Sequence, residues 1–183
     1  CLFNRAEGIS GGAINRGMTN KGELNSRYSV FIGNHVDGGG TCDCFAWYGG
    51  EGFMLANTAV DPLNAGITAG STSGSSHSQF IGNNVFGTGR ANCTAYSIAH
   101  DDGKITLKGG SISGFTKATA ITSYTGATEL ILDLECDNNT GPVEIYTTGK
   151  LPKLTVKGTA KITNNSQCLW LRGPGGFGQV VVD

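Results

Sequence analysis

The tetrapeptide FIGN occurs twice in the chain, at residues 31–34 and again at residues 80–83, a separation of 49 residues. The same separation relates two later segments, ITLKGGS from Ile105 and LTVKGTA from Leu154. An apolar segment lies midway within each pair: MLANT near residue 54 and LILDLEC from Leu130. A chain that returns to a similar short strand every 24 or 25 residues is built from stacked units, each burying its apolar side against the next.

The repeat extends over the whole chain. Apolar segments of this first series lie near residues 30, 54, 79, 104, 129, 153 and 178, and a second series with the same step includes Ile121, Ile145 and Leu169. The 30 glycines supply turns between short strands, and no segment keeps a 3.6-residue apolar period. The sequence therefore predicts an all-β, right-handed parallel β-helix, or β-solenoid, of about seven coils of 24–25 residues. We expect one domain over residues 1–183, and an excerpt or processed part of a longer chain, since the sequence lacks an initiator Met.

Charged residues recur at the same step. Neighbours in a parallel solenoid stack about 4.8 Å apart, so an alternation of Lys and acid along a column replaces repulsion with attraction. Two such columns are predicted, one of Lys104, Glu129 and Lys153 and one of Lys108, Asp133 and Lys157.

Asparagines at the strand ends suggest a second kind of column. Asn34 and Asn83 end the two FIGN copies, and the 24-residue step places Thr58 between them. Side chains in this position are expected to hydrogen-bond along the stack and satisfy backbone groups at a corner, which is a structural role.

Composition excludes several classes of function. A net charge of −1 with 15% charged residues gives no basis for nucleic-acid binding, and no apolar run is long enough to span a membrane. The histidines are not spaced as zinc ligands, so neither a metal nor another cofactor is expected. The six cysteines are candidates for up to three disulfides, or for small buried apolar side chains: Cys1, Cys42, Cys44, Cys93, Cys136 and Cys168.

Acidic residues give the candidates for catalysis. The 24-residue step places Asp37 above Asp61, with His35 nearby, which would suit a carboxylate pair acting on a glycosidic bond. A structural alternative is that both acids bond their own turns. A second polar cluster, which also matches a turn signal, comprises His100, Asp101 and Asp102.

Aromatic residues give the candidates for binding. Tyr146 and Trp170 lie one 24-residue step apart, and both point outward if Ile145 and Leu169 point inward. Neighbouring exposed rings can stack on sugar rings or form a protein interface, while the structural alternative is that they cover the core.

The motif GGAI at residues 11–14, followed by FIGN at residues 31–34, resembles the GGA(I/L/V)…FxxN repeat of the polymorphic outer-membrane proteins of chlamydiae. The segment LTVKGTAKITNNS similarly resembles coils of bacterial surface β-helix proteins. This resemblance implies an exposed, often secreted protein with an adhesive or structural role, and it implies no catalytic residues.

Two functions are therefore expected. The first is an extracellular or cell-surface adhesive, stalk or filament-forming module, with a glycan or a surface protein as partner, or with copies of itself associating through the ends of the solenoid. The alternative is a carbohydrate-active β-helix such as a phage tailspike depolymerase, a polysaccharide lyase or a glycoside hydrolase.

Overall fold

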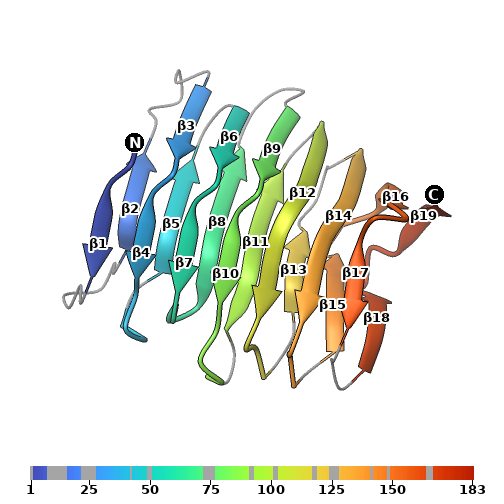
Figure 1. Cartoon of the computed structure of the whole chain (residues 1–183). Coiled ribbons are helices and arrows are strands. Elements are labelled where there is room, and N and C mark those ends of the chain that lie inside the picture. Colours follow the sequence, from blue (N-terminus) through green and yellow to red (C-terminus); the bar gives the residue numbers. More distant parts are fainter. Residues whose placement is uncertain are drawn as a thin grey trace.

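The computed structural model describes residues 2–7, 16–21, 28–41, 43–48, 51–71, 77–90, 93–100, 103–116, 119–123, 128–140, 142–147, 149–163 and 167–183. Every named element among them is a β-strand, and every strand pairing is parallel. The strands stack along one axis, with the two termini at its opposite ends (Figure 1). The predicted β-solenoid class is confirmed.

The strands form three faces. The first face contains β3 (Tyr28–Ile32), β6 (Glu51–Leu55), β9 (His77–Ile81), the first part of β12 (Lys104–Ser113), the first part of β14 (Glu129–Asp137), β16 (Leu151–Val156) and β19 (Phe177–Val182). The second face contains β1 (Arg5–Glu7), β4 (His35–Asp37), β7 (Thr58–Val60), β10 (Asn84–Phe86), the second parts of β12 and β14, and β17 (Lys161–Thr163). Because β12 and β14 run through both faces, the first and second faces together form one 12-stranded sheet.

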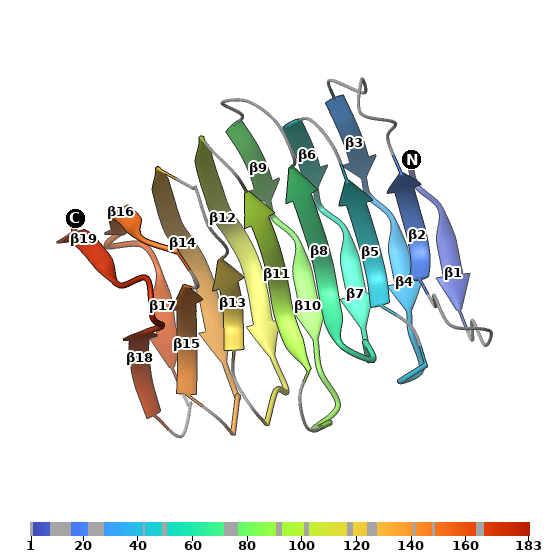
Figure 2. The ribbon, with the colours of Figure 1, turned by 180° about the vertical axis from the view of Figure 1, so that it is seen from behind.

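The third face is a separate sheet of seven strands that follow one another in chain order: β2 (Arg16–Lys21), β5 (Asp43–Tyr48), β8 (Ala65–Ser71), β11 (Thr94–His100), β13 (Thr119–Ser123), β15 (Pro142–Thr147) and β18 (Gln167–Arg172). Figure 1 shows the 12-stranded sheet in front, with strands such as β4, β7, β10, β12 and β14 pointing down, and Figure 2 shows the seven-stranded sheet in front with its strands pointing up. The chain advances from left to right in Figure 1, so the solenoid winds right-handed.

Alternate residues of the first face build the core. Phe31, Met54, Phe80, Leu107 and Leu132 are paired in register from coil to coil, and each is at most 1% exposed. The rings also pack across to the third face, where Phe31 meets Phe45 edge-on at 6.1 Å and Phe80 meets Tyr96 at 5.6 Å. Burying each large side chain contributes about 1.5–3 kcal/mol, so this column is a major source of stability.

The coils are less uniform than the sequence suggests. The successive core residues Phe31, Met54, Phe80, Leu107 and Leu132 lie 23, 26, 27 and 25 residues apart, whereas the sequence predicts steps of 24–25. Turns of different length between the faces absorb these differences. A side chain placed by the average step can therefore be one or two residues from its true partner.

An asparagine ladder, comprising Asn4, Asn34, Asn57 and Asn83, lines the corner between the first and second faces. Asn57 Oδ1 accepts from the backbone N–H and the Nδ2 of Asn34, both at 2.9 Å, and Asn83 Oδ1 accepts in the same way from Asn57 at 3.0 and 2.9 Å. Asn34 repeats the pattern with Asn4. The expected position of Thr58 in this column is wrong by one residue, because the first step is 23 residues, and Thr58 pairs with His35 instead.

The ionic ladder, comprising Lys104, Glu129 and Lys153, is confirmed. The three residues are in register on the outside of the first face, and the Glu129 carboxylate meets Lys104 Nζ at 3.1 Å and Lys153 Nζ at 2.9 Å. The second predicted column is correct for Lys108 and Asp133, which are paired in register. Lys157 continues this register, since it follows the pair Leu132–Val156 and its backbone N–H donates to the Leu132 carbonyl, but its ammonium forms an ion pair with Asp183 of the next coil.

Candidate functional site

The expected Asp37–Asp61 column is wrong by one residue, since Asp37 pairs with Val60. Asp37 Oδ1 accepts from the backbone N–H of Gly39 at 3.0 Å, which closes the turn after β4. His35 lies two residues earlier in the same strand and pairs with Thr58. The short coil that separates Asn34 from Asn57 is the reason for the shift.

Asp61 has more side-chain contacts than Asp37, the other candidate acid that the structure describes. Arg90 Nε donates to its Oδ1 at 2.7 Å and Arg90 Nη2 to its Oδ2 at 3.1 Å, and the Thr88 hydroxyl donates as well. The hydrogen bond from Arg90 holds the pKa of Asp61 below its ordinary value. These contacts, together with the left-handed backbone at Asp61 (φ 45°), favour a role in holding a turn to the following coil over a role as a proton donor.

The second predicted acidic cluster is located only in part. His100 is the last residue of β11 and pairs with Ser71 in β8. Asp101 and Asp102 lie outside the described residues. Catalysis at this cluster stays a prediction.

An aromatic cluster, comprising Tyr146, Trp170 and Arg172, lies on the outside of the third face. Tyr146 pairs with Arg172 and not with Trp170, because the step from β15 to β18 is 26 residues instead of the expected 24, and a bulge between Pro142 and Val143 supplies one of the two extra residues. Both rings nevertheless face one cation: the Arg172 guanidinium carbon lies 5.9 Å from the Tyr146 ring centroid and 6.0 Å from that of Trp170. These distances fall within the range of a cation–π contact.

A buried carboxylate fixes the cation of this cluster. Glu144 is 6% exposed and accepts from Arg172 Nε, and it stands one residue before the core residue Ile145. A buried charge requires a partner of opposite sign, so the Arg172 guanidinium is held where it contacts both rings. Trp170 keeps 43% of its surface exposed. The cluster therefore presents an accessible indole on a rigid sheet.

The cysteine prediction is corrected for three residues. Cys44, Cys93 and Cys136 are buried thiols in the core, not members of disulfides. Burial raises the pKa of Cys93, and it raises the pKa of Cys136 to about 12, which keeps both protonated at neutral pH. Cys1 and Cys42 lie outside the described residues, and only the strand position of Cys168 is given, in β18.

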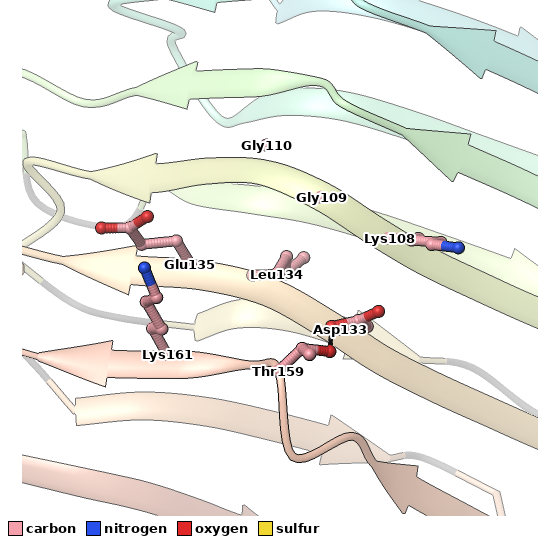
Figure 3. A pocket seen from close by; sticks show the side chains of 8 residues that line it. All are labelled: Lys108, Gly109, Gly110, Asp133, Leu134, Glu135, Thr159 and Lys161. Carbon is pink, nitrogen blue, oxygen red and sulfur yellow. Dashed lines mark hydrogen bonds between the residues drawn. The ribbon is translucent and has the colours of Figure 1, made fainter.

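A cavity of about 360 Å³, which we name the corner cavity, opens where the first and second faces meet between β12, β14 and β17 (Figure 3). Lys108 and Asp133 lie at one end and Glu135 and Lys161 at the other, as Figure 3 shows. Sequence reasoning missed this site. Its only signal in the sequence is the pair Gly109–Gly110. In the preceding coils the second position of this pair is an asparagine, as in Gly82–Asn83.

Within the described part of the chain, no group of three or more His, Cys, Asp or Glu side chains is arranged to hold a metal ion. That part also contains no helix that is both long and apolar enough to cross a membrane. Comparisons with protein-family models, curated proteins and solved structures gave no significant match.

Proposed function

We propose that this chain is a non-catalytic β-solenoid module that acts outside the cell or at its surface and adheres to glycans through the aromatic cluster. The observation that carries the proposal is the pair of rings that contact one guanidinium on the outside of a parallel sheet, with Trp170 accessible. The faces of sugar rings carry C–H groups, which pack on aromatic faces, while sugar hydroxyls bond polar groups such as Arg172.

The states of the acidic residues support a non-catalytic role. The hydrogen bond from Arg90 lowers the pKa of Asp61, and the hydrogen bonds from the ladder lysines lower the pKa of Glu129. Asp37 closes its own turn. A glycosidase requires one carboxyl group that remains protonated near neutral pH and a second one beside it. The contacts of Asp61 and Glu129 favour the ionised form, which suits a scaffold.

The test is a panel of polysaccharides assayed in parallel for binding and for cleavage. Binding without cleavage is expected, and Trp170→Ala is expected to weaken it at least tenfold, with a smaller loss for Tyr146→Ala. Phe86→Ala is the matched control, because Phe86 is an aromatic residue on the second face that is 36% exposed. Equal binding by the Trp170 and Phe86 variants would contradict the proposed site.

Cleavage of any polysaccharide in the panel would contradict the proposal and favour the alternative function, a carbohydrate-active enzyme. An Asp37→Asn, Asp61→Asn double variant then tests the acids of the second face. Loss of cleavage in that variant would assign the activity to them, and retained cleavage would direct attention to His100, Asp101 and Asp102.

A further inference from the structure

The corner cavity exists because the coils change shape at this height. In β12, Gly109 and Gly110 together stand opposite the single residue Leu134 of the straighter strand β14. In the next coil, the four residues 157–160 form a turn between β16 and β17. In β14 only two residues, Asp133 and Leu134, lie opposite this turn. One straight strand thus runs between two bulged coils, which leaves a hollow on the outer surface.

The two glycines leave one wall of the hollow bare. Both have a left-handed backbone, with φ of +62° at Gly109 and +78° at Gly110. A Cβ atom on Gly110 would lie 2.0 Å from the carbonyl oxygen of Asn83, so that position requires glycine. A Cβ atom on Gly109 would meet nothing closer than 3.7 Å, so a side chain there has room to project.

The charged residues of the cavity differ from those of the neighbouring ionic ladder. In the ladder every charge is paired, whereas Lys108, Glu135 and Lys161 form no ion pair with any residue that the structure describes. Asp133 accepts a hydrogen bond from Thr159. Lys108 stands in register with Asp133, and Glu135 with Lys161, but no ion pair forms across either register, so these side chains are available to bond a ligand placed between them.

The balance of these groups limits the class of ligand. Two carboxylates disfavour an anion such as phosphate, and two ammonium groups disfavour a metal cation. Leu134 is the only apolar side chain of the lining and is 4% exposed, so an apolar ligand would gain little. A neutral ligand with many hydroxyls suits the lining, because hydroxyls both donate to carboxylates and accept from ammonium groups.

On the basis of the glycan-binding function proposed above, we propose that the corner cavity binds one neutral sugar residue, at a second site separate from the aromatic cluster. A volume of about 360 Å³ lies near the lower limit of ligand pockets, which suits a single sugar ring. The two sites lie on different sheets, so they would contact different sugar residues of a chain or different glycans.

Two pairs of variants separate binding from folding. Gly109→Asn adds a side chain at a residue that lines the cavity. Gly82→Asn is its control, because Gly82 has nearly the same backbone (φ +63°) one coil away and lies outside the lining. Asparagine tolerates a left-handed backbone. Glu135→Gln removes an unpaired charge of the cavity, and Glu129→Gln removes a charge of the same strand that lysines already pair.

The probes are the methyl glycosides of glucose, galactose, mannose and N-acetylglucosamine, with inorganic phosphate and Ca²⁺ as charged comparisons. All are titrated by NMR against the wild-type chain, these four variants and Trp170→Ala. We expect at least one glycoside to bind with a dissociation constant of about 1 mM. We expect Gly109→Asn and Glu135→Gln to weaken that binding at least tenfold, and Gly82→Asn and Glu129→Gln to leave it unchanged.

The outcomes distinguish this proposal from the preceding one. If no glycoside binds, or if phosphate or Ca²⁺ binds in their place, the sugar site is refuted. If glycosides bind and only Trp170→Ala weakens binding, the corner cavity is refuted while the proposed function stands. If the cavity variants weaken binding and Trp170→Ala does not, the corner cavity is supported and the aromatic cluster is refuted.

Discussion

The two halves of the solenoid hold their coils together by different means. In the N-terminal half the asparagine ladder runs inside the corner, where Asn34, Asn57 and Asn83 are at most 1% exposed. In the described coils of the C-terminal half, Gly110 and Leu134 stand at this corner in place of asparagines, and the ionic ladder lies on the outer surface. One column of paired residues at the end of the first face changes in the same way. It is apolar in the N-terminal half, with Ile32, Leu55 and Ile81, and charged in the C-terminal half, with Lys108 and Asp133.

The comparison teaches that two halves with the same architecture can be stabilised by different interactions. A buried amide that loses its partner costs about 1–3 kcal/mol for each unsatisfied group, because water cannot replace the partner. An exposed ion pair contributes about 0–1 kcal/mol, because water and salt compete for both charges. The N-terminal half should therefore depend strongly on single side chains, and the C-terminal half weakly.

The largest effect is expected for Asn57→Ala. The substitution removes the acceptor of two donors of Asn34 and a donor to both Asn83 Oδ1 and the Phe31 carbonyl. We expect the free energy of unfolding to fall by about 3–4 kcal/mol, as measured by urea denaturation. Asn64→Ala, at an exposed position, is the control and should change it by less than about 0.5 kcal/mol. Similar losses in both variants would show that the ladder is not a special source of stability.

The next largest effect is expected at the residue where the ladder ends. Gly110→Ala should cost about 2–3 kcal/mol, since the new Cβ would lie 2.0 Å from a backbone carbonyl and the backbone is left-handed. Gly109→Ala shares only the backbone conformation and should cost about 1–2 kcal/mol. Thermal denaturation of both variants measures the difference, and the reverse order would contradict the close approach of the two coils at Gly110.

A smaller effect is expected in the ionic ladder. Glu129→Gln should lower the free energy of unfolding by less than about 1 kcal/mol at low salt. At 1 M NaCl, where charges are screened beyond about 3 Å, the difference from the wild type should nearly vanish. The loss in Asn57→Ala should persist at that salt concentration. A salt-independent loss in Glu129→Gln would mean that its carboxylate acts through burial instead.

The smallest effect is expected in the pH dependence of the free energy of unfolding, compared between the wild type and Glu129→Gln. The hydrogen bond from Lys153, and then that from Lys104, lowers the pKa of Glu129 from its ordinary value of 4.5 although partial burial opposes the shift. Its stabilisation is therefore complete above pH 4.5 and disappears as the pH falls through the lower pKa of the folded state. The gap between wild type and Glu129→Gln should close in this acidic range, whereas the gap for Asn57→Ala should stay constant.

Much of the fold could be predicted from the sequence because the signal repeats. An apolar strand at each step needs only an approximate period to be recognised, and core residues such as Ile105, Leu130 and Leu154 are paired as the 49-residue offset implies. The ionic ladder was predictable for the same reason, since Lys104, Glu129 and Lys153 fall where successive coils are close to the average length.

The candidate sites required an accuracy that the average period lacks. Asp37 is one residue from its expected partner because of a short coil. Tyr146 is two residues out of register with Trp170, because this coil is longer than average and a bulge adds one of the two residues. Both irregularities arise from turns and backbone bulges, which leave little trace in the apolar pattern. Arg172 of β18 was missed because its partner Glu144 lies in β15, the neighbouring strand of the same sheet. Only the shifted register between these two strands brings the pair together.

The chemistry of the two ladders has a consequence for how such a chain can lengthen during evolution. The inner members Asn34 and Asn57 each donate to one asparagine and accept from another, so a duplicated coil would fit between any two members of that ladder. The ionic ladder alternates in sign, so a duplicated coil would place two like charges side by side, and only pairs of coils preserve the pattern. The asparagine ladder thus accepts any number of added coils, whereas the charge alternation of the ionic ladder is preserved only by even numbers.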